Sequence, residues 1–89
     1  MVKINYAYLE LDHIVEFSKD NTLFVSAKEN GNGRTRLFLV HQDTGNVYTR
    51  NGRADSWEEL SGPDRDTILA RILVSRGNIP VYRINGSHA

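Results

Sequence analysis

The stretch TLFVSAKENGNGRTRLFLVHQDTGNVYTR, residues 22–50, decides the fold because it indicates three strands joined by two turns. The strand segments 22–28, 34–41 and 46–50 are rich in β-branched and aromatic residues. The first connection, residues 30–33, alternates asparagine with glycine, and the second contains Asp43, Thr44 and Gly45. These residue types suit tight turns, and glycine and asparagine tolerate the positive φ angles that many such turns need. The stretch therefore predicts a three-stranded antiparallel meander.

Alternation along each strand sorts the meander into two faces, because neighbouring residues of a strand point to opposite sides of a sheet. The face expected to line the core carries five apolar residues: Leu23, Val25, Leu37, Leu39 and Val47. The opposite face is expected to set four large side chains beside four cations: Phe24, Phe38, Val40 and Tyr48 with Lys28, Arg34, Arg36 and Arg50. This second face is the arrangement in the sequence that points most directly to a function.

The length of 89 residues indicates one domain, residues 1–89, expected to bury roughly 60–65% of its unfolded surface. Hydrophobic residues make up 39% and charged residues 25%, which excludes a disordered or collagen-like chain. The absence of cysteine excludes disulfides, thiolate nucleophiles and Cys-based zinc sites. No apolar run approaches the roughly 20 residues of a membrane span, and the N-terminus lacks a signal-peptide pattern. We therefore expect a cytoplasmic protein that does not bind membranes.

The charges balance overall but are distributed unevenly along the chain. Eleven basic and eleven acidic residues give a formal net charge of zero, which argues against a generally basic nucleic-acid binder and against a DNA mimic. Residues 21–53 carry five basic and two acidic side chains, whereas residues 54–73 carry two basic and five acidic ones. A basic sheet beside an acidic segment suits recognition of a partner, and it equally suits charge pairing within the chain.

The N-terminal segment supports two interpretations. Apolar residues recur at three- and four-residue intervals, which favours a helix capped by Asn5 and ending near Ser18. The residues of this stripe are Ile4, Ala7, Tyr8, Leu11, Ile14 and Val15. The alternative is a strand, because residues 2–8 also alternate and residues 14–17 are β-branched and aromatic. We predict the helix; a strand here would instead extend the sheet.

The C-terminal half predicts a helix followed by a strand. Ser56 and Glu59 have the spacing of a capping box, which predicts a short helical turn. The main helix is expected near residues 63–76, with Pro63 in its first turn and Gly77 after its end. Its expected apolar stripe is Ile68, Leu69, Ile72 and Leu73. Residues 79–84 predict an edge strand that starts beside Pro80, and residues 84–89 are expected to form a frayed tail. The predicted fold class is therefore α+β.

No catalytic or metal-binding constellation stands out. His13 follows Asp12, and His41 lies near Asp43, but nothing in their spacing brings a nucleophile, a base and an orienting group together. The acidic and histidine residues match no established metal-ligand spacing. The glycine-rich residues 30–33 lack the lysine of a phosphate-binding loop and join two strands. We expect no enzymatic activity, no cofactor and no metal.

The expected function is stoichiometric binding to another protein, as accessory subunits and phage or mobile-element inhibitors do. The residues expected to carry binding are Arg34, Arg36, Tyr48, Arg50 and Trp57, because arginine and aromatic residues anchor many interfaces. The alternative is single-stranded nucleic acid, whose bases the aromatic rings would stack and whose phosphates the cations would meet. A third interpretation buries the same face, with Trp57 packed on the main helix. An exposed strand edge would also permit homo-oligomers.

Overall fold

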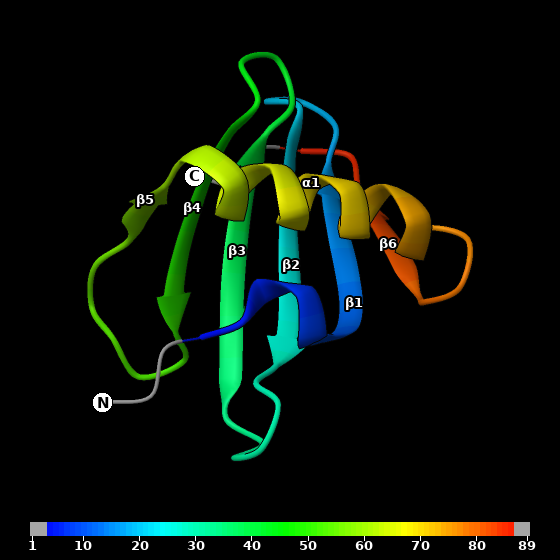
Figure 1. Cartoon of the computed structure of the whole chain (residues 1–89). Coiled ribbons are helices and arrows are strands. Elements are labelled where there is room, and N and C mark those ends of the chain that lie inside the picture. The colour runs from blue at the N-terminus through cyan, green and yellow to red at the C-terminus, as the bar shows by residue number, and fades with distance from the viewer. Residues whose placement is uncertain (1–3, 87–89) are drawn as a thin grey trace.

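Within residues 4–86, the part of the chain that the computed structural model describes, a six-stranded sheet is covered on one side by a helix (Figure 1). The elements in chain order are η1 (Tyr6–Tyr8), β1 (Glu10–Phe17), β2 (Thr22–Lys28), β3 (Thr35–His41), β4 (Asn46–Asn51), β5 (Glu58–Leu60), α1 (Gly62–Ser75) and β6 (Val81–Ile84). The strand order is β5-β4-β3-β2-β1-β6, and the β1–β6 pair alone is parallel. The α+β class is confirmed, with a sheet wider than the predicted meander.

The two predicted turns lie where glycine permits a backbone that other residues resist. Gly31 and Gly33 have φ angles of 97° and 67° in the β2–β3 connection, and Gly45 has a φ of 77° between β3 and β4. Asp43 also accepts a hydrogen bond from Asn21, at 2.6 Å, which ties the second turn to the β1–β2 connection. The prediction of turns at these positions is therefore confirmed.

The register of β3 contradicts the predicted faces of that strand. Val25 pairs with Phe38, and Phe38 pairs in turn with Thr49. Phe38 and Val40 therefore point toward α1 with the core residues of β2 and β4, whereas Leu37 and Leu39 point to the other side. The prediction reversed this strand because residues 37–40 are all apolar, so alternation alone cannot choose its inner face. Arg36 consequently lies on the helix side of the sheet.

The predicted N-terminal helix is wrong, and a β-bulge explains the misleading pattern. Asn5 does cap a helical turn, since its Oδ1 accepts a hydrogen bond from the Ala7 amide, but this turn is only the short η1. The chain then extends as β1, whose register shifts between Leu11 and His13. The extra residue places Leu11 and Ile14 on one face at a spacing of three, which resembles helical periodicity.

A short strand, β5, replaces the helical turn that the capping-box spacing of Ser56 and Glu59 predicted. β5 pairs with β4 in the ladder, with Leu60 opposite Val47. Both of these side chains are buried in the core. An extended backbone thus buries Leu60 on the sheet, where a helical turn would lose the ladder hydrogen bonds.

Helix α1 confirms the predicted main helix, with Ser61 before it and Arg76 after it. Its 14 residues span about 21 Å, close to the roughly 24 Å width of six strands. The helix therefore carries the chain across the sheet from the β5 edge to the β6 edge (Figure 1). Ile68 and Ile72 are buried, but Leu73 is 74% exposed, so its place in the predicted stripe is wrong.

The core lies between α1, η1 and the near face of the sheet. Its buried residues come from η1's flank, five strands and the helix: Leu9, Leu11, Ile14, Leu23, Val25, Ala27, Phe38, Val40, Val47, Leu60, Ile68 and Ile72. Arg71 of α1 donates hydrogen bonds to the carbonyl oxygens of Tyr6 and Leu9, which fastens η1 under the helix. None of the helices in the described part of the chain has the length and apolar character to cross a membrane.

The C-terminal strand is confirmed as β6, and backbone hydrogen bonding extends to Gly86. Ile84, placed in the frayed tail by the prediction, ends β6, and Ser18 donates to its carbonyl oxygen. The Lys19 amide likewise donates to the carbonyl oxygen of Gly86. The rest of the predicted tail, residues 87–89, lies outside the described residues.

Candidate functional site

The surface of the sheet opposite α1, here called the open face, is the candidate site. Both helices of residues 4–86 lie on the other side of the sheet (Figure 1). Antiparallel sheets often present one face to water, and that face is then mostly polar. The composition of the open face departs from this expectation.

One row of residues crosses the open face over all six strands. The pairing registers place its members side by side from β5 to β6: Glu59, Tyr48, Leu39, Phe24, Val15 and Tyr82. Five of these six side chains are apolar or aromatic. Leu39, in the middle, is 8% exposed although no helix covers it, whereas Tyr82 at the β6 end is 57% exposed. We call this set the central row.

An aromatic cluster with one cation adjoins the central row. The Arg50 guanidinium lies over the Trp57 ring, with its carbon 4.9 Å from the ring centre. Trp57 in turn meets Phe24 edge to face, with ring centres 6.4 Å apart. Arg50 also donates a hydrogen bond of 2.7 Å to the Ala54 carbonyl oxygen, which holds the loop before β5 against β4. The structure therefore brings together three of the predicted site residues, Tyr48, Arg50 and Trp57, on one face.

The competing interpretation placed Trp57 against the main helix, but Trp57 does not pack there. Its contacts are with Phe24 and Arg50, both on the open face, and its side chain is half-buried. This location adds an indole ring to the open face instead of to the core.

The other two predicted site residues lie elsewhere. Arg36 points to the helix side, where its Nε donates to a Glu29 carboxylate oxygen at 2.9 Å, and both side chains are 11% exposed. Burial raises the pKa of Glu29, but hydrogen bonds from Asn32 and Arg36 outweigh it and hold that pKa below its ordinary value. Arg34 lies in the exposed β2–β3 connection. The open face therefore carries fewer cations than predicted.

The remaining charges on the open face are nearly balanced. Lys28 stands opposite Glu10 in the β1–β2 ladder, and Arg50 lies two residues along β4 from Tyr48, which is opposite Glu59. The imidazole of His41 meets Tyr48 edge to face at 5.6 Å, and that of His13 meets Tyr82 at 5.9 Å. The face thus combines rings and apolar groups with little net charge.

The sequence-based prediction missed Val15, Leu39 and Tyr82 as residues of the site. The sequence pattern places Val15 in a helix and Leu39 on the core face, and it places Tyr82 in an edge strand without indicating which strand lies beside it. Only the parallel pairing of β6 with β1, which sets Tyr82 beside Val15, shows that they continue one surface. The alternation of residues 79–84 was the available signal for Tyr82.

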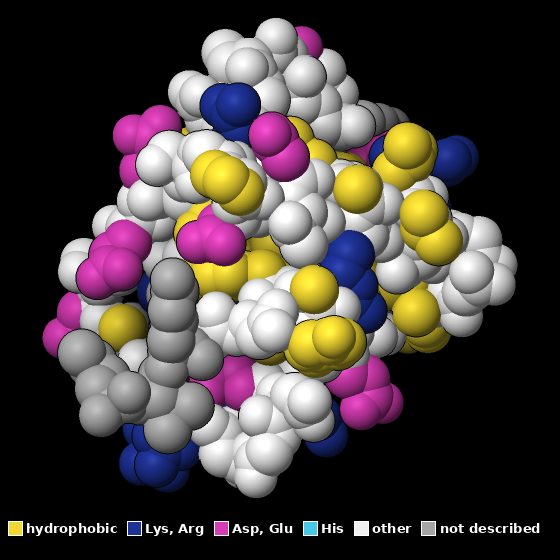
Figure 2. All heavy atoms as spheres, in the orientation of Figure 1, with side chains coloured by type: hydrophobic (Ala, Val, Ile, Leu, Met, Phe, Trp, Pro, Cys, Tyr) yellow, Lys and Arg dark blue, Asp and Glu magenta, His cyan; other side chains and the backbone are white. Residues whose placement is uncertain are grey.

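The other face of the molecule also carries exposed apolar side chains, but they are separated by polar and charged groups (Figure 2). These residues are Tyr8 of η1 with Leu73 and Val74 of α1. Scattered exposed apolar residues are ordinary on protein surfaces, whereas a row of neighbouring apolar and aromatic side chains across a sheet face that no helix covers is less common. The open face is therefore the stronger candidate for a binding surface.

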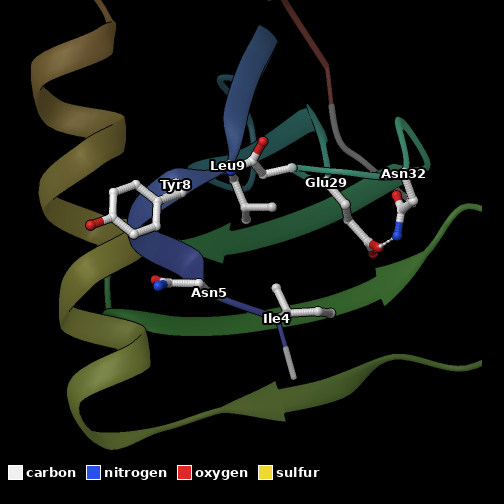
Figure 3. Close-up of a pocket in the computed structure, with 7 residues that line it drawn as sticks. Ile4, Asn5, Tyr8, Leu9, Glu29 and Asn32 are labelled. Carbon is white, nitrogen blue, oxygen red and sulfur yellow. Dashed lines mark hydrogen bonds between the residues drawn. The ribbon is translucent and has the colours of Figure 1, made fainter. Parts of the chain in front are cut away.

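Two cavities lie on the helix side, away from the open face. One, of about 140 Å³, is lined by residues of η1, its flanks and the β2–β3 connection, among them Asn5, Tyr8 and Glu29 (Figure 3). The other is bordered by Ile4, Asn5, Tyr6 and Asp64. Neither includes His41 or Asp43, the pair considered for catalysis. Within residues 4–86, no three histidine or acidic residues gather in a way that would hold a metal ion.

No family model, no curated protein and no solved structure matches this chain.

Proposed function

We propose that this protein works by stoichiometric binding to another protein, and that the open face is its docking surface. The observation that carries the proposal is the central row. Its partly exposed members Tyr48, Phe24, Val15 and Tyr82 are apolar or aromatic and lie on either side of the nearly covered Leu39. Burying such a row against a partner removes apolar surface from water, which is the main driving force of protein association.

The chemistry of the expected partner follows from Arg50. Its guanidinium is oriented by the Trp57 ring and by the Ala54 carbonyl oxygen, which occupies one of its nitrogens. The remaining N–H groups form a planar fork that suits a carboxylate. The partner surface is therefore expected to be apolar at its centre, with an Asp or Glu side chain facing Arg50.

Single-stranded nucleic acid is the less favoured occupant of the same face. Its recognition would require several cations beside the stacking rings, since phosphate contacts supply most of the affinity. Arg36 is directed to the helix side and paired with Glu29, and Lys28 stands opposite Glu10. These positions reduce the positive charge that the open face can offer.

The test uses a partner isolated with the wild-type protein and then purified, so that affinity and stoichiometry are measured by titration. Tyr82→Glu and Arg50→Glu place charge on the open face and are expected to weaken binding by at least about tenfold. Val74→Glu is the control, because Val74 is exposed, at 72%, and lies on α1 on the other side of the sheet. That variant should bind as the wild type does.

Two outcomes would overturn the proposal. If Val74→Glu abolished binding while the open-face variants bound normally, the docking surface would be the helix side. If the isolated partner were a nucleic acid whose affinity fell steeply with added salt, the open face would bind single-stranded nucleic acid and not a protein.

A further inference from the structure

Four of the seven glycines in this chain follow an asparagine. The pairs are Asn30-Gly31, Asn32-Gly33, Asn51-Gly52 and Asn85-Gly86. Asparagine is a chemically labile residue, and a following glycine increases this lability because it has no side chain to obstruct attack by its own backbone nitrogen. The chain therefore has four candidate sites for a spontaneous covalent change, deamidation.

The reaction needs only water. The glycine nitrogen, after losing its proton to solvent base, attacks the side-chain carbonyl carbon, Cγ, of the asparagine. A new N–C bond forms, the bond from Cγ to the side-chain nitrogen breaks, and ammonia leaves, so that a five-membered succinimide remains. Water then opens the ring at either carbonyl and gives aspartate or isoaspartate. In total one water is consumed and one ammonia is released.

Two features of a folded chain oppose this reaction. Hydrogen bonds to the asparagine side chain hold Cγ away from the attacking nitrogen, and intramolecular reactions depend steeply on that geometry. A hydrogen bond from the glycine N–H to a carbonyl oxygen opposes the loss of its proton. The four pairs differ in how many of these restraints they have.

Asn32-Gly33 and Asn51-Gly52 have both restraints. The Asn32 side chain accepts from the Arg34 amide and donates to Glu29, while the Gly33 N–H donates to the Glu29 carbonyl oxygen. The Asn51 side chain accepts from the Arg53 amide at 2.9 Å, and the Gly52 N–H donates to the Thr35 carbonyl oxygen at 3.0 Å.

Asn85-Gly86 has one restraint. Its asparagine Oδ1 accepts a hydrogen bond of 3.0 Å from the Ser18 hydroxyl. The Gly86 N–H donates no hydrogen bond within residues 4–86.

Asn30-Gly31 has neither restraint. Within the described part of the chain, no hydrogen bond holds the Asn30 side chain and none engages the Gly31 N–H. Both residues are exposed at the tip of the β2–β3 connection. We propose that Asn30 is a site of spontaneous deamidation. In the folded protein Asn30 is converted first and Asn85 second, whereas Asn32 and Asn51 are protected.

The change would alter the charge of a specific region. A carboxylate at position 30 adds a negative charge to a chain whose formal net charge is zero. It also lies next to Glu29 and borders the cavity that Asn30 helps to line. Isoaspartate would in addition lengthen the backbone of the turn by one methylene.

The experiment incubates the purified protein at mildly alkaline pH, folded and in urea, and follows each asparagine by peptide mass spectrometry. In the folded protein, Asn30 is expected to convert at least about tenfold faster than Asn32 and Asn51, with Asn85 between them. In urea, where all restraints are removed, the four sites should convert at similar rates. Asn30→Gln, whose longer side chain closes the ring poorly, should remove the earliest modification.

The proposal is overturned if Asn32 or Asn51 converts as fast as Asn30 in the folded protein. It is equally overturned if the order of the four sites is the same in urea as in the folded state, because local sequence and not structure would then set the rates.

Discussion

The ion pair of Glu29 and Arg36 is largely shielded from water, since both side chains are only 11% exposed. Arg36 also donates to the Thr49 hydroxyl, and Glu29 also accepts from Asn32. These contacts join the β2–β3 connection to β4. They show why a residue predicted to bind a partner instead supports the fold.

Glu29→Gln is expected to lower the free energy of unfolding by roughly 1–3 kcal/mol at pH 7, since it leaves Arg36 without its charged partner. The folded chain holds the pKa of Glu29 below its ordinary value of 4.5. The stabilisation from the Glu29–Arg36 ion pair is therefore fully present above about pH 4.5 and is lost as the pH falls through the lower pKa of the folded state. Urea unfolding at several pH values should show the wild type and Glu29→Gln converging in acid. Glu59→Gln, on an exposed side chain, is the control; an equal loss there would contradict the assignment.

The elements show how far the sequence could predict the fold. Turn chemistry located β2, β3 and β4, and the proline and glycine signals located α1. The inner face of β3 could not be predicted, because residues 37–40 are all apolar and their pattern does not determine the register with β2. In the candidate site, Tyr48, Arg50 and Trp57 were predicted, whereas Val15 was hidden by the bulge in β1.

The bulge in β1 leads to a deletion experiment. Removing Asp12 leaves Leu11, His13 and Ile14 in regular alternation, so the deleted chain should keep its core and unfold cooperatively. Removing Val15 instead turns Glu16 and Phe17 to the opposite faces and should prevent cooperative folding. Circular dichroism and thermal unfolding would compare the two deletions. Loss of the fold in the Asp12 deletion would show that the bulge itself is required.

Substitutions at adjacent positions on the buried and exposed sides of α1 should change the stability by very different amounts. Ile72 is 3% exposed and packs in the core, so Ile72→Ala should cost about 2–5 kcal/mol of stability. Leu73 is 74% exposed, and Leu73→Ala should change stability by less than about 0.5 kcal/mol. Equilibrium urea unfolding of both variants checks the contrast, and similar losses would mean that the helix is rotated from its described orientation.

Taken whole, the molecule has two layers, with a helix on one side of the sheet and the open face on the other (Figure 1). An apolar strip on a folded protein should bind a hydrophobic fluorescent dye without unfolding. We expect a Tyr48→Glu/Tyr82→Glu variant to lose most of this native-state fluorescence. Leu73→Glu/Val74→Glu adds the same charge on α1 and should retain more of it. Equal losses in both variants would indicate that the dye does not report on the open face.

The parallel pairing of β6 with β1 has a consequence for synthesis on the ribosome. Ile14 and Val81, which lie opposite each other, are 67 positions apart in the chain. A nascent chain can form the β1–β2 hairpin early, but the outer edge of β1 has no partner until the last strand emerges. During that interval its backbone N–H and C=O groups are open to pairing with other chains. Translation past β6 is therefore the step that closes the sheet, and a stalled or shortened product would be the form most in need of a chaperone.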